Sequence, residues 1–390
     1  MFSKYQDKKV LRSLQKNPNW KLLKFSDVLR DETKNAKKIK KEEYLAQGSY
    51  PIIDQGKDYI AGFTNDREGV YDKSPLIIFG DHTRILKYID FPIFIGADGV
   101  KLLKNVFSEE EVLTKYIYYY LRTVNIPDTG YNRHFKFLKE VVIPIPNIYL
   151  QKRIVFVLDK AQEFIDKRKA QIEALDQLTQ SVFLDMFGDP KTNPKNWDVI
   201  PLGELFEIKT GGTPSRENKN YWQNGKIPWV KTTEIKENTI LVTEEYITEE
   251  GLRNSNAVLL PKNTILIAMY GQGKTRGRTA KLGIEATTNQ ACAAILPCKE
   301  HNPDFIWRQL MMQYQTLRDL GRGGNQPNLN LTLIKQFKII VPPLSQQNTF
   351  AKIIQKIEFQ KDLLQKSLVE LENNFNSLMQ RAFKGELFND

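Results

Sequence analysis

The sequence predicts an α+β protein with a pseudo-two-fold internal repeat, in which two mixed α/β modules are joined by two long antiparallel helices that form a coiled coil. Two observations lead to this fold class. Residues 151–187 and 347–383 follow the same helical pattern at a constant offset of 196 residues, and each stretch closes a segment that opens on a tryptophan, Trp20 or Trp197. The chain of 390 residues also exceeds the usual size of a single core, and its 41% hydrophobic content is enough for two.

The modules themselves repeat at a different offset. Apolar residues follow Trp20 and Trp197 at the same distances, and the offset between these tryptophans, 177, is smaller than the helix offset of 196 by 19. The second module therefore carries a net insertion of that length. Each module ends in a proline-terminated β run, at 141–146 and 339–343. Proline stops a strand ladder but is tolerated just before a helix. The predicted segments are modules at 1–150 and 189–344 and spacer helices at 151–188 and 345–390.

The two long helices carry apolar residues at steps of three and four, which is the a/d spacing of a coiled coil. A helix that faces a globular core has similar spacing, but a core does not require the same register in two copies. Arg168, Thr179 and Lys361 make the pattern less apolar than that of a strong coiled coil. The predicted helix-pair interface comprises Leu158, Ala161, Ile165, Ile172, Leu175, Val182, Ile354, Ile357, Leu364, Leu368, Leu371, Phe375 and Leu378.

Charge and composition narrow the class of partner. The chain has 57 basic and 46 acidic residues, a net charge of +11, which favours binding to a polyanion but also fits a lysine-rich solvated surface. Cys292 and Cys298 match no metal or redox spacing, and we expect them to be reduced thiols. No apolar run reaches membrane-spanning length, and the first residues do not resemble a secretory signal, so we expect a cytoplasmic protein.

Glycine-containing loops rich in basic and amide side chains follow an apolar strand in both modules. Strand 76–79 leads into 80–84, and strand 265–270 leads into 271–278. A second such cluster precedes each proline exit. Each loop alone fits an ordinary turn, but their recurrence favours a shared role, since Arg and Lys read guanine and Asn and Gln read adenine. The candidate DNA-binding residues are His82, Arg84, Asn132, Arg133, His134, Lys231, Thr232, Thr233, Lys274, Arg276, Arg278, Arg322, Asn325 and Gln326.

Enzyme and nucleotide-binding alternatives find little support. Gly273, Lys274 and Thr275 follow a strand, as in a phosphate-binding loop, but two more glycines follow where a helix would have to begin. The three histidines have no metal-ligand spacing, and no catalytic constellation is found. We therefore expect a non-catalytic protein with no metal site. A coiled-coil scaffold that binds protein without DNA specificity stays open as an alternative.

The repeated order of tryptophan, proline-rich exit, glutamine (Gln151 or Gln347) and long helix resembles the specificity subunit of type I restriction-modification enzymes. The resemblance covers about residues 20–387, and its most specific elements are 211–215 (Gly-Gly-Thr-Pro-Ser) and 227–230 (Ile-Pro-Trp-Val). The first module departs from the pattern in two respects. It has no Gly-Gly-Thr-Pro segment, and its proline-to-glutamine interval is one residue longer.

The resemblance implies a function. Each module would be a target-recognition domain for one half of a bipartite site in double-stranded DNA, and the helix pair would set the spacer and dock methyltransferase subunits, two in number. Restriction subunits with motor and nuclease activity would join the complex. The chain would have no cofactor, because S-adenosylmethionine, ATP and Mg would be bound by its partners. The predicted interface spans 25 residues from Leu158 to Val182, about 37 Å of helix, close to one DNA turn of about 34 Å.

Overall fold

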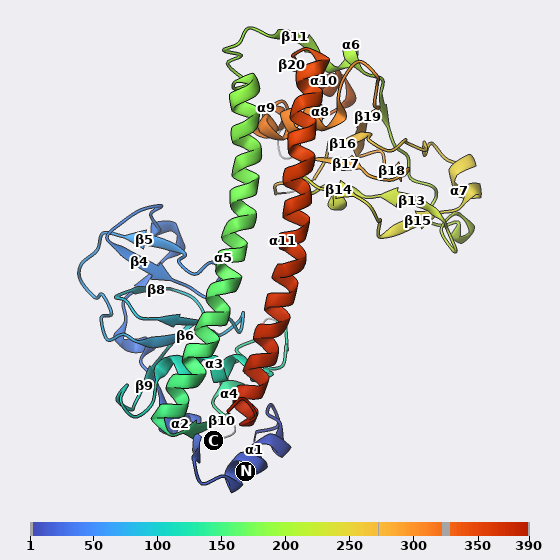
Figure 1. Cartoon of the computed structure of the whole chain (residues 1–390). Coiled ribbons are helices and arrows are strands. Elements are labelled where there is room, and N and C mark those ends of the chain that lie inside the picture. The colour runs from blue at the N-terminus through green and yellow to red at the C-terminus, as the bar shows by residue number, and fades with distance from the viewer. Residues whose placement is uncertain (1–2, 131, 272, 322–327, 389–390) are drawn as a thin grey trace. The chain divides into compact units, whose positions relative to one another are not determined.

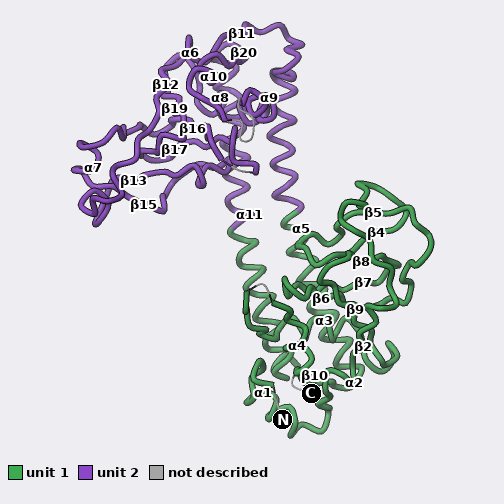
Figure 2. The backbone as a smooth tube through the Cα atoms, turned by 180° about the vertical axis from the view of Figure 1, so that it is seen from behind, with its two compact units in different colours: residues 1–169, 366–390 green, residues 170–365 purple. Residues whose placement is uncertain are grey.

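The protein divides into two compact units, each of which contains parts of both long helices. The computed structural model describes residues 3–130, 132–271, 273–321 and 328–388. Unit 1 comprises residues 1–169 and 366–390, and unit 2 comprises residues 170–365 (Figure 2). Helix α5 (Ile148–Phe187) begins in unit 1 and ends in unit 2, whereas α11 (Leu344–Lys384) runs from unit 2 to unit 1 (Figure 1). The two long helices predicted from periodicity are therefore present.

Unit 1 contains two four-stranded sheets, in the orders β2-β9-β6-β7 and β3-β8-β4-β5, and an antiparallel pair of β1 with β10. Its strands are β1 (Trp20–Lys24), β2 (Leu29–Asp31), β3 (Lys38–Ile39), β4 (Tyr50–Ile53), β5 (Gly62–Thr64), β6 (Leu76–Gly80), β7 (Leu86–Ile89), β8 (Phe94–Gly96), β9 (Val100–Asn105) and β10 (Val142–Pro146). Its shorter helices are α1 (Lys8–Lys16), α2 (Phe25–Val28), α3 (Thr114–Arg122) and α4 (Phe135–Leu138), with 3₁₀ turns η1 (Thr33–Asn35) and η2 (Lys41–Glu43).

Unit 2 contains a five-stranded sheet in the order β12-β19-β16-β17-β14, a three-stranded sheet in the order β15-β13-β18, and an antiparallel pair of β11 with β20. Its strands are β11 (Asp198–Pro201), β12 (Ile208–Thr210), β13 (Ile227–Val230), β14 (Thr239–Ile240), β15 (Glu245–Ile247), β16 (Ile265–Ala268), β17 (Thr279–Leu282), β18 (Thr287–Thr288), β19 (Cys292–Ile295) and β20 (Lys338–Val341). Its shorter helices are α6 (Leu202–Leu205), α7 (Glu249–Arg253), α8 (Pro303–Met312), α9 (Tyr314–Asp319) and α10 (Leu331–Gln336), with 3₁₀ turns η3 (Lys219–Tyr221) and η4 (Thr232–Glu234).

The strand pairing of the two units repeats in detail. Strands β4 and β13 begin at Tyr50 and Ile227, which are separated by the same offset as the two tryptophans. Each strand pairs antiparallel with one neighbour, β5 or β15, and parallel with the other, β8 or β18. Strands β6 and β16 both lie between two antiparallel neighbours. The internal repeat therefore extends from the sequence into sheet topology.

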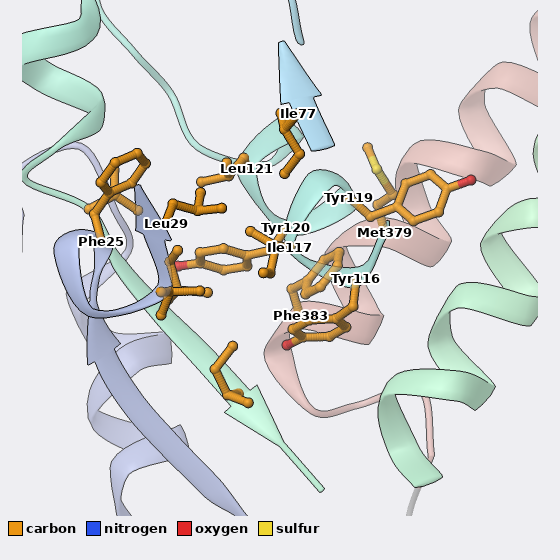
Figure 3. Packing of buried hydrophobic residues seen from close by; sticks show 14 of the residues in the cluster. Phe25, Leu29, Ile77, Tyr116, Ile117, Tyr119, Tyr120, Leu121, Met379 and Phe383 are labelled. Atoms are coloured by element: carbon orange, nitrogen blue, oxygen red, sulfur yellow. The ribbon is translucent and has the colours of Figure 1, made fainter. Parts of the chain in front are cut away.

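The core of unit 1 is completed by the end of α11. Phe375, Met379 and Phe383 are buried beside tyrosines of α3. The Phe383 ring lies 5.5 Å from that of Tyr116 and 5.4 Å from that of Tyr120 (Figure 3). Residues of the first part of α5 join the same cluster. Within unit 1, the beginning of one long helix therefore packs with the end of the other.

The core of unit 2 is completed by the end of α5 in the same way. Phe187 is fully buried, with its ring 4.7 Å from that of Phe305 in α8 and 5.4 Å from that of Phe350 in α11. Phe183 stacks on Phe305 at 5.7 Å. Each aromatic side chain buried in this way stabilises the fold by about 3–5 kcal/mol relative to alanine. Both cores thus depend on a helix that starts in the other unit.

The residues of the predicted helix-pair interface are buried or half-buried within their own units. In unit 1, Leu158, Ile165 and Phe375 are buried, and Ala161, Leu368, Leu371 and Leu378 pack partly buried against them. In unit 2, Ile354 and Ile357 are buried, Leu175 and Val182 pack against their cluster, and Ile172 and Leu364 are half-buried. The polar positions are also accommodated: the Thr179 hydroxyl donates to the Leu175 carbonyl at 3.1 Å, and Lys361 pairs with Asp176.

A buried glutamine fixes the start of each long helix. The Gln151 carbonyl accepts from Leu113 N at 2.9 Å and its amide donates to Pro146 O at 2.8 Å. Gln347 makes the same pair of bonds with Asn302 N at 2.9 Å and Pro342 O at 2.7 Å. The interval from the bonded proline to the glutamine is thus five residues in both copies. The longer interval inferred for the first module from the sequence is wrong, because Pro342, not Pro343, is the structural counterpart of Pro146.

We expect Gln151→Leu to lower the free energy of unfolding by about 1–3 kcal/mol, because it leaves the Leu113 N–H and the Pro146 carbonyl buried without a partner. The measurement is denaturant unfolding of the full chain. Gln177→Leu, at an exposed position of the same helix, is the matched control and should change stability by about 0.5 kcal/mol or less. Equal stability of the two variants would contradict the role given to Gln151.

Candidate nucleic-acid interface

In unit 1, the structure brings together the two loops that the sequence singled out. The turn after β6 and the segment before α4 are joined by an ion pair between Arg84 Nη2 and Asp128 Oδ2 at 2.6 Å. The His82 ring Nδ1 lies 3.2 Å from the Asn132 carbonyl, and the Phe135 N–H donates to Asp81 Oδ1 at 2.7 Å. The two candidate clusters therefore form one continuous surface.

In unit 2, the loop after β16 is held by Arg318, which was not among the sequence candidates. Arg318 of α9 donates from Nη2 to Gly273 O at 2.7 Å and from Nη1 to Arg276 O at 3.0 Å. The Tyr314 hydroxyl donates to Lys274 O at 2.8 Å. The loop after β16 is thus held against α9. The candidates Arg322, Asn325 and Gln326 lie outside the described residues.

Both loops close on a residue with positive φ whose N–H bonds back to the end of the strand, although the loop lengths differ. Arg84 has φ 62° and its N–H donates to Gly80 O at 2.7 Å, whereas Gly277 has φ 84° and donates to Ala268 O at 2.9 Å. A side chain is uncommon in this left-handed region, and at Arg84 the ion pair with Asp128 helps to hold it. The loop of unit 2 is five residues longer, since 277−268 exceeds 84−80 by that number. It leads into β17 rather than into a helix, so a phosphate-binding loop is not formed.

The side chains of the candidate residues differ in their exposure to solvent. Exposed candidates are Asn132, Arg133, Thr233 and Lys274. Half-buried candidates are His82, Arg84, Lys231, Thr232, Arg276 and Arg278. Within the described part of the chain, the guanidinium of Arg133 forms no ion pair or hydrogen bond. Arg133 and Lys274, which likewise forms no side-chain bond with the described residues, are therefore the candidate cations most available to an external anion.

His134 is a structural residue, so its selection as a DNA contact is corrected. Its side chain is fully buried. Ring Nδ1 lies 2.9 Å from the Asp81 carbonyl, and Nε2 lies 3.3 Å from the Thr129 hydroxyl. Nδ1 thus joins the two loops of unit 1, and Nε2 holds the segment that precedes α4. The backbone N–H of His134 also donates to Asp81 O, at 2.8 Å. In unit 2 the corresponding backbone bond, to Met269 O at 3.0 Å, comes from the buried Leu329.

A third loop belongs to this surface in unit 1 and was missed in the sequence. Gln55 follows β4, and its Oε1 accepts from the His82 N–H at 3.1 Å, while the Thr83 hydroxyl donates to the Gln55 carbonyl at 2.7 Å. Subtracting the module offset of 177 from Thr232 gives Gln55. The module offset could have identified Gln55 from the sequence, because this offset relates the candidates after β13 to the loop after β4.

The loop after β4 is anchored by a buried lysine. The Lys87 side chain is only 4% exposed, and its Nζ donates to the carbonyls of Asp54 at 2.8 Å and Asp58 at 2.5 Å. The Asp54 carboxylate lies 3.7 Å away. Burial lowers the pKa of Lys87, and the nearby aspartates oppose this shift. Since Gln55 contacts the turn after β6, Lys87 indirectly positions that turn.

In unit 2, Lys231 is committed to neighbouring carboxylates. Its Nζ lies 2.7 Å from Glu244 and 3.1 Å from Glu245, and hydrogen bonds to Glu244 and Glu245 raise the pKa of Lys231. A lysine already paired in this way is less available to a phosphate than Arg133. Thr233 beside it is exposed. The side chain of Thr233 is therefore more available to an external ligand than that of Lys231.

The Gly-Gly-Thr-Pro segment has a packing role. A Cβ on Gly211 would lie 1.9 Å from the Thr288 carbonyl oxygen, and one on Gly212 would lie 2.3 Å from the Asn256 backbone. Only glycine permits so close an approach. The Trp229 indole donates to Gly212 O at 3.0 Å. The segment therefore holds β13 against the neighbouring backbone, and it also positions the loop that carries Thr233.

Other types of site find no support in the described residues. They contain no cluster of three or more side chains suited to bind a metal ion. Cys292 and Cys298 are free thiols, the former buried, which raises its pKa to about 12. None of the helices in the described ranges has the length and apolarity needed to cross a membrane.

Comparison with known proteins gives a consistent picture. A sequence model of the family described as "Type I restriction modification DNA specificity domain" matches residues 17–177 and 194–373. The chain is 26% identical over 351 residues to the specificity subunit of the Escherichia coli type I restriction enzyme EcoR124I/EcoR124II, with 86% of each chain covered. It is 25% identical over 313 residues to the MjaIX specificity subunit of Methanocaldococcus jannaschii, covering 73% of this chain and 71% of the relative.

Solved structures show the same fold. The S subunit of the type I restriction-modification system from M. genitalium matches with a TM-score of 0.56 at 19% identity, covering 96% of this chain and 97% of that one. A chain from a study of assembly and conformational transition in a type I system matches with a TM-score of 0.54 at 15% identity, covering 95% and 99%. The two family matches cover most of the sequence, and the chain therefore belongs to the family of type I restriction-modification DNA specificity subunits, with two copies of the specificity domain.

Proposed function

We propose that each unit reads one half of a bipartite site in double-stranded DNA and that the chain catalyses no reaction itself. The recognition domains would be residues 1–150 and 189–344. The observation that carries this proposal is that both units bond the residue after their central strand to the segment that leads into α4 or α10. The His134 N–H donates to Asp81 O at 2.8 Å in one unit, and the Leu329 N–H donates to Met269 O at 3.0 Å in the other. Side chains on such loops can reach base edges, while the sheets keep them fixed.

We propose further that residues 151–188 and 345–390 are spacer helices paired as an antiparallel coiled coil. The packing within each unit supports this, since the beginning of one helix lies with the end of the other in both cores. Ion pairs between the helices, Lys169–Glu372 at 3.2 Å and Lys361–Asp176, support the same register. A pair of fixed length would hold the two half-sites at a constant separation of about one DNA turn.

Exposed apolar side chains on the long helices support docking of methyltransferase subunits. In unit 1, Tyr149, Phe156 and Phe164 of α5 are 67%, 64% and 59% exposed. In unit 2, Phe359 and Leu363 of α11 are 61% and 44% exposed. Large apolar side chains gathered on one element typically mark a protein interface. We propose two methyltransferase subunits, with restriction subunits joining them in the cytoplasm. S-adenosylmethionine, ATP and Mg would belong to these partners.

For DNA recognition, we expect Arg133→Ala to weaken binding to the cognate duplex by about 1–3 kcal/mol. If Arg133 contacts a base, discrimination at one position of one half-site should relax; uniform weakening would assign it to a phosphate. The measurement is duplex binding at fixed salt, with each base pair of the site varied. Arg253→Ala removes another exposed arginine of the chain and serves as the control. Equal affinities of the two variants would remove Arg133 from the interface.

For docking, we expect Phe156→Ser together with Phe164→Ser to weaken assembly with the methyltransferase at least about ten-fold, because both side chains would be buried at the interface. Binding of the full chain to DNA should be unchanged. Leu241→Ser with Val242→Ser removes two equally exposed apolar side chains outside the long helices and is the control. Assembly that is unaffected by the Phe156 and Phe164 substitutions, or reduced equally by the control, would exclude this docking face.

A further inference from the structure

The segment before Trp20 has no counterpart in the second half, yet it is a fixed part of unit 1. The side-chain amide of Gln6 bonds to β10 in the way that a neighbouring strand would. Its Oε1 accepts from the Val142 N–H at 2.9 Å, and its Nε2 donates to Val142 O at 2.6 Å. Helix α1 follows, with Leu11 and Leu14 buried. The position of the α1 surface relative to unit 1 is therefore defined.

This segment packs on α4, the helix that follows the second loop of the candidate nucleic-acid interface in unit 1. The Tyr5 ring lies 5.3 Å from the Phe137 ring, edge to face, and Phe137 lies 6.1 Å from the ring of His134, which joins the two loops. Lys4 lies over Tyr5 at 5.2 Å and Lys136 over Phe137 at 4.9 Å. Two lysines therefore flank the contact between the N-terminal segment and the interface.

The outward face of α1 is strongly basic. Lys8, Lys9, Arg12 and Lys16 are exposed, and none forms an ion pair or hydrogen bond through its side chain with the described residues. The one acid of the segment, Asp7, is used as the helix N-cap and accepts from Lys9 N at 2.8 Å. Cations on the long helices differ: Lys160 and Lys167 both pair with Glu163. Among the described residues of unit 1, the charge of α1 is thus left uncompensated.

We propose that residues 3–16 bind the phosphate backbone of duplex DNA beside the half-site that unit 1 reads. The inference rests on the proposed DNA recognition by unit 1 and adds a contact that carries no sequence information. Continuity with the interface through Lys4, Tyr5 and Phe137 favours DNA over an acidic protein surface as the partner. Because the described residues of unit 2 contain no counterpart of α1, the two half-sites would be held unequally.

The test replaces Lys8, Lys9, Arg12 and Lys16 by glutamine, which forms helices well and leaves Leu11 and Leu14 in place. Affinity of the full chain for its cognate duplex is measured across a range of salt concentrations. We expect affinity at low salt to fall about ten-fold or more and the slope of log affinity against log salt to become shallower by about 0.9 for each phosphate that the variant no longer neutralises. Discrimination between cognate and altered half-sites should not change. Hydroxyl-radical footprinting should show weaker protection on the flank of one half-site only.

The control replaces four exposed lysines of unit 2, Lys335, Lys338, Lys352 and Lys356, by glutamine, which alters the net charge equally. Similar decreases in affinity for both variants, or an unchanged slope and footprint in the α1 variant, would overturn the inference while leaving DNA recognition intact. Failure to assemble with the methyltransferase at unchanged DNA affinity would also overturn it, by assigning α1 to a protein partner. A parent chain that binds duplex DNA without salt dependence or sequence preference would instead contradict the proposed function.

Discussion

The structure depends on one constraint: each unit completes its core with the end of a helix that begins in the other unit. Phe375, Met379 and Phe383 close unit 1, and Phe183 and Phe187 close unit 2. Large aromatic side chains at these positions contribute several kcal/mol each when buried. A change in the length or register of either helix would therefore disturb a core. This explains why the helices keep one offset while the modules between them differ in length.

The candidate loops can differ in length and sequence between the two units, because each unit holds its loops with its own side chains. Unit 1 uses the buried Lys87 and the fully buried His134 to hold short turns. Unit 2 has a longer loop and fixes it with two guanidinium bonds from Arg318. In both units the loops start from corresponding strands of the sheets. Loop chemistry can then change from one specificity to another without altering the core that carries the loops.

The sequence predicted those features that leave a periodic signal. The long helices and the repeat followed from two constant offsets, and the packing of the helix-pair residues follows their a/d spacing. Features set by local geometry were not predictable in that way. His134 is of a residue type that often contacts DNA bases, but its burial depends on hydrogen bonds with neighbouring residues. Gln55 is not basic and follows no glycine-rich turn, so only the repeat offset points to it. Pro342 and Pro343 cannot be distinguished until the bond from Gln347 identifies the counterpart of Pro146.

The central claim is that the helix pair fixes the distance between two independently read half-sites. Inserting seven residues into each helix, after Gln171 and after Ser367, preserves the a/d register and lengthens the pair by about 10 Å, or about three base pairs at about 3.4 Å each. The measurement is sequencing of the methylated sites in cells that carry this chain with its methyltransferase. The account predicts two unchanged half-sites separated by a spacer about three base pairs longer. An unchanged spacer, with methylation retained, would contradict it.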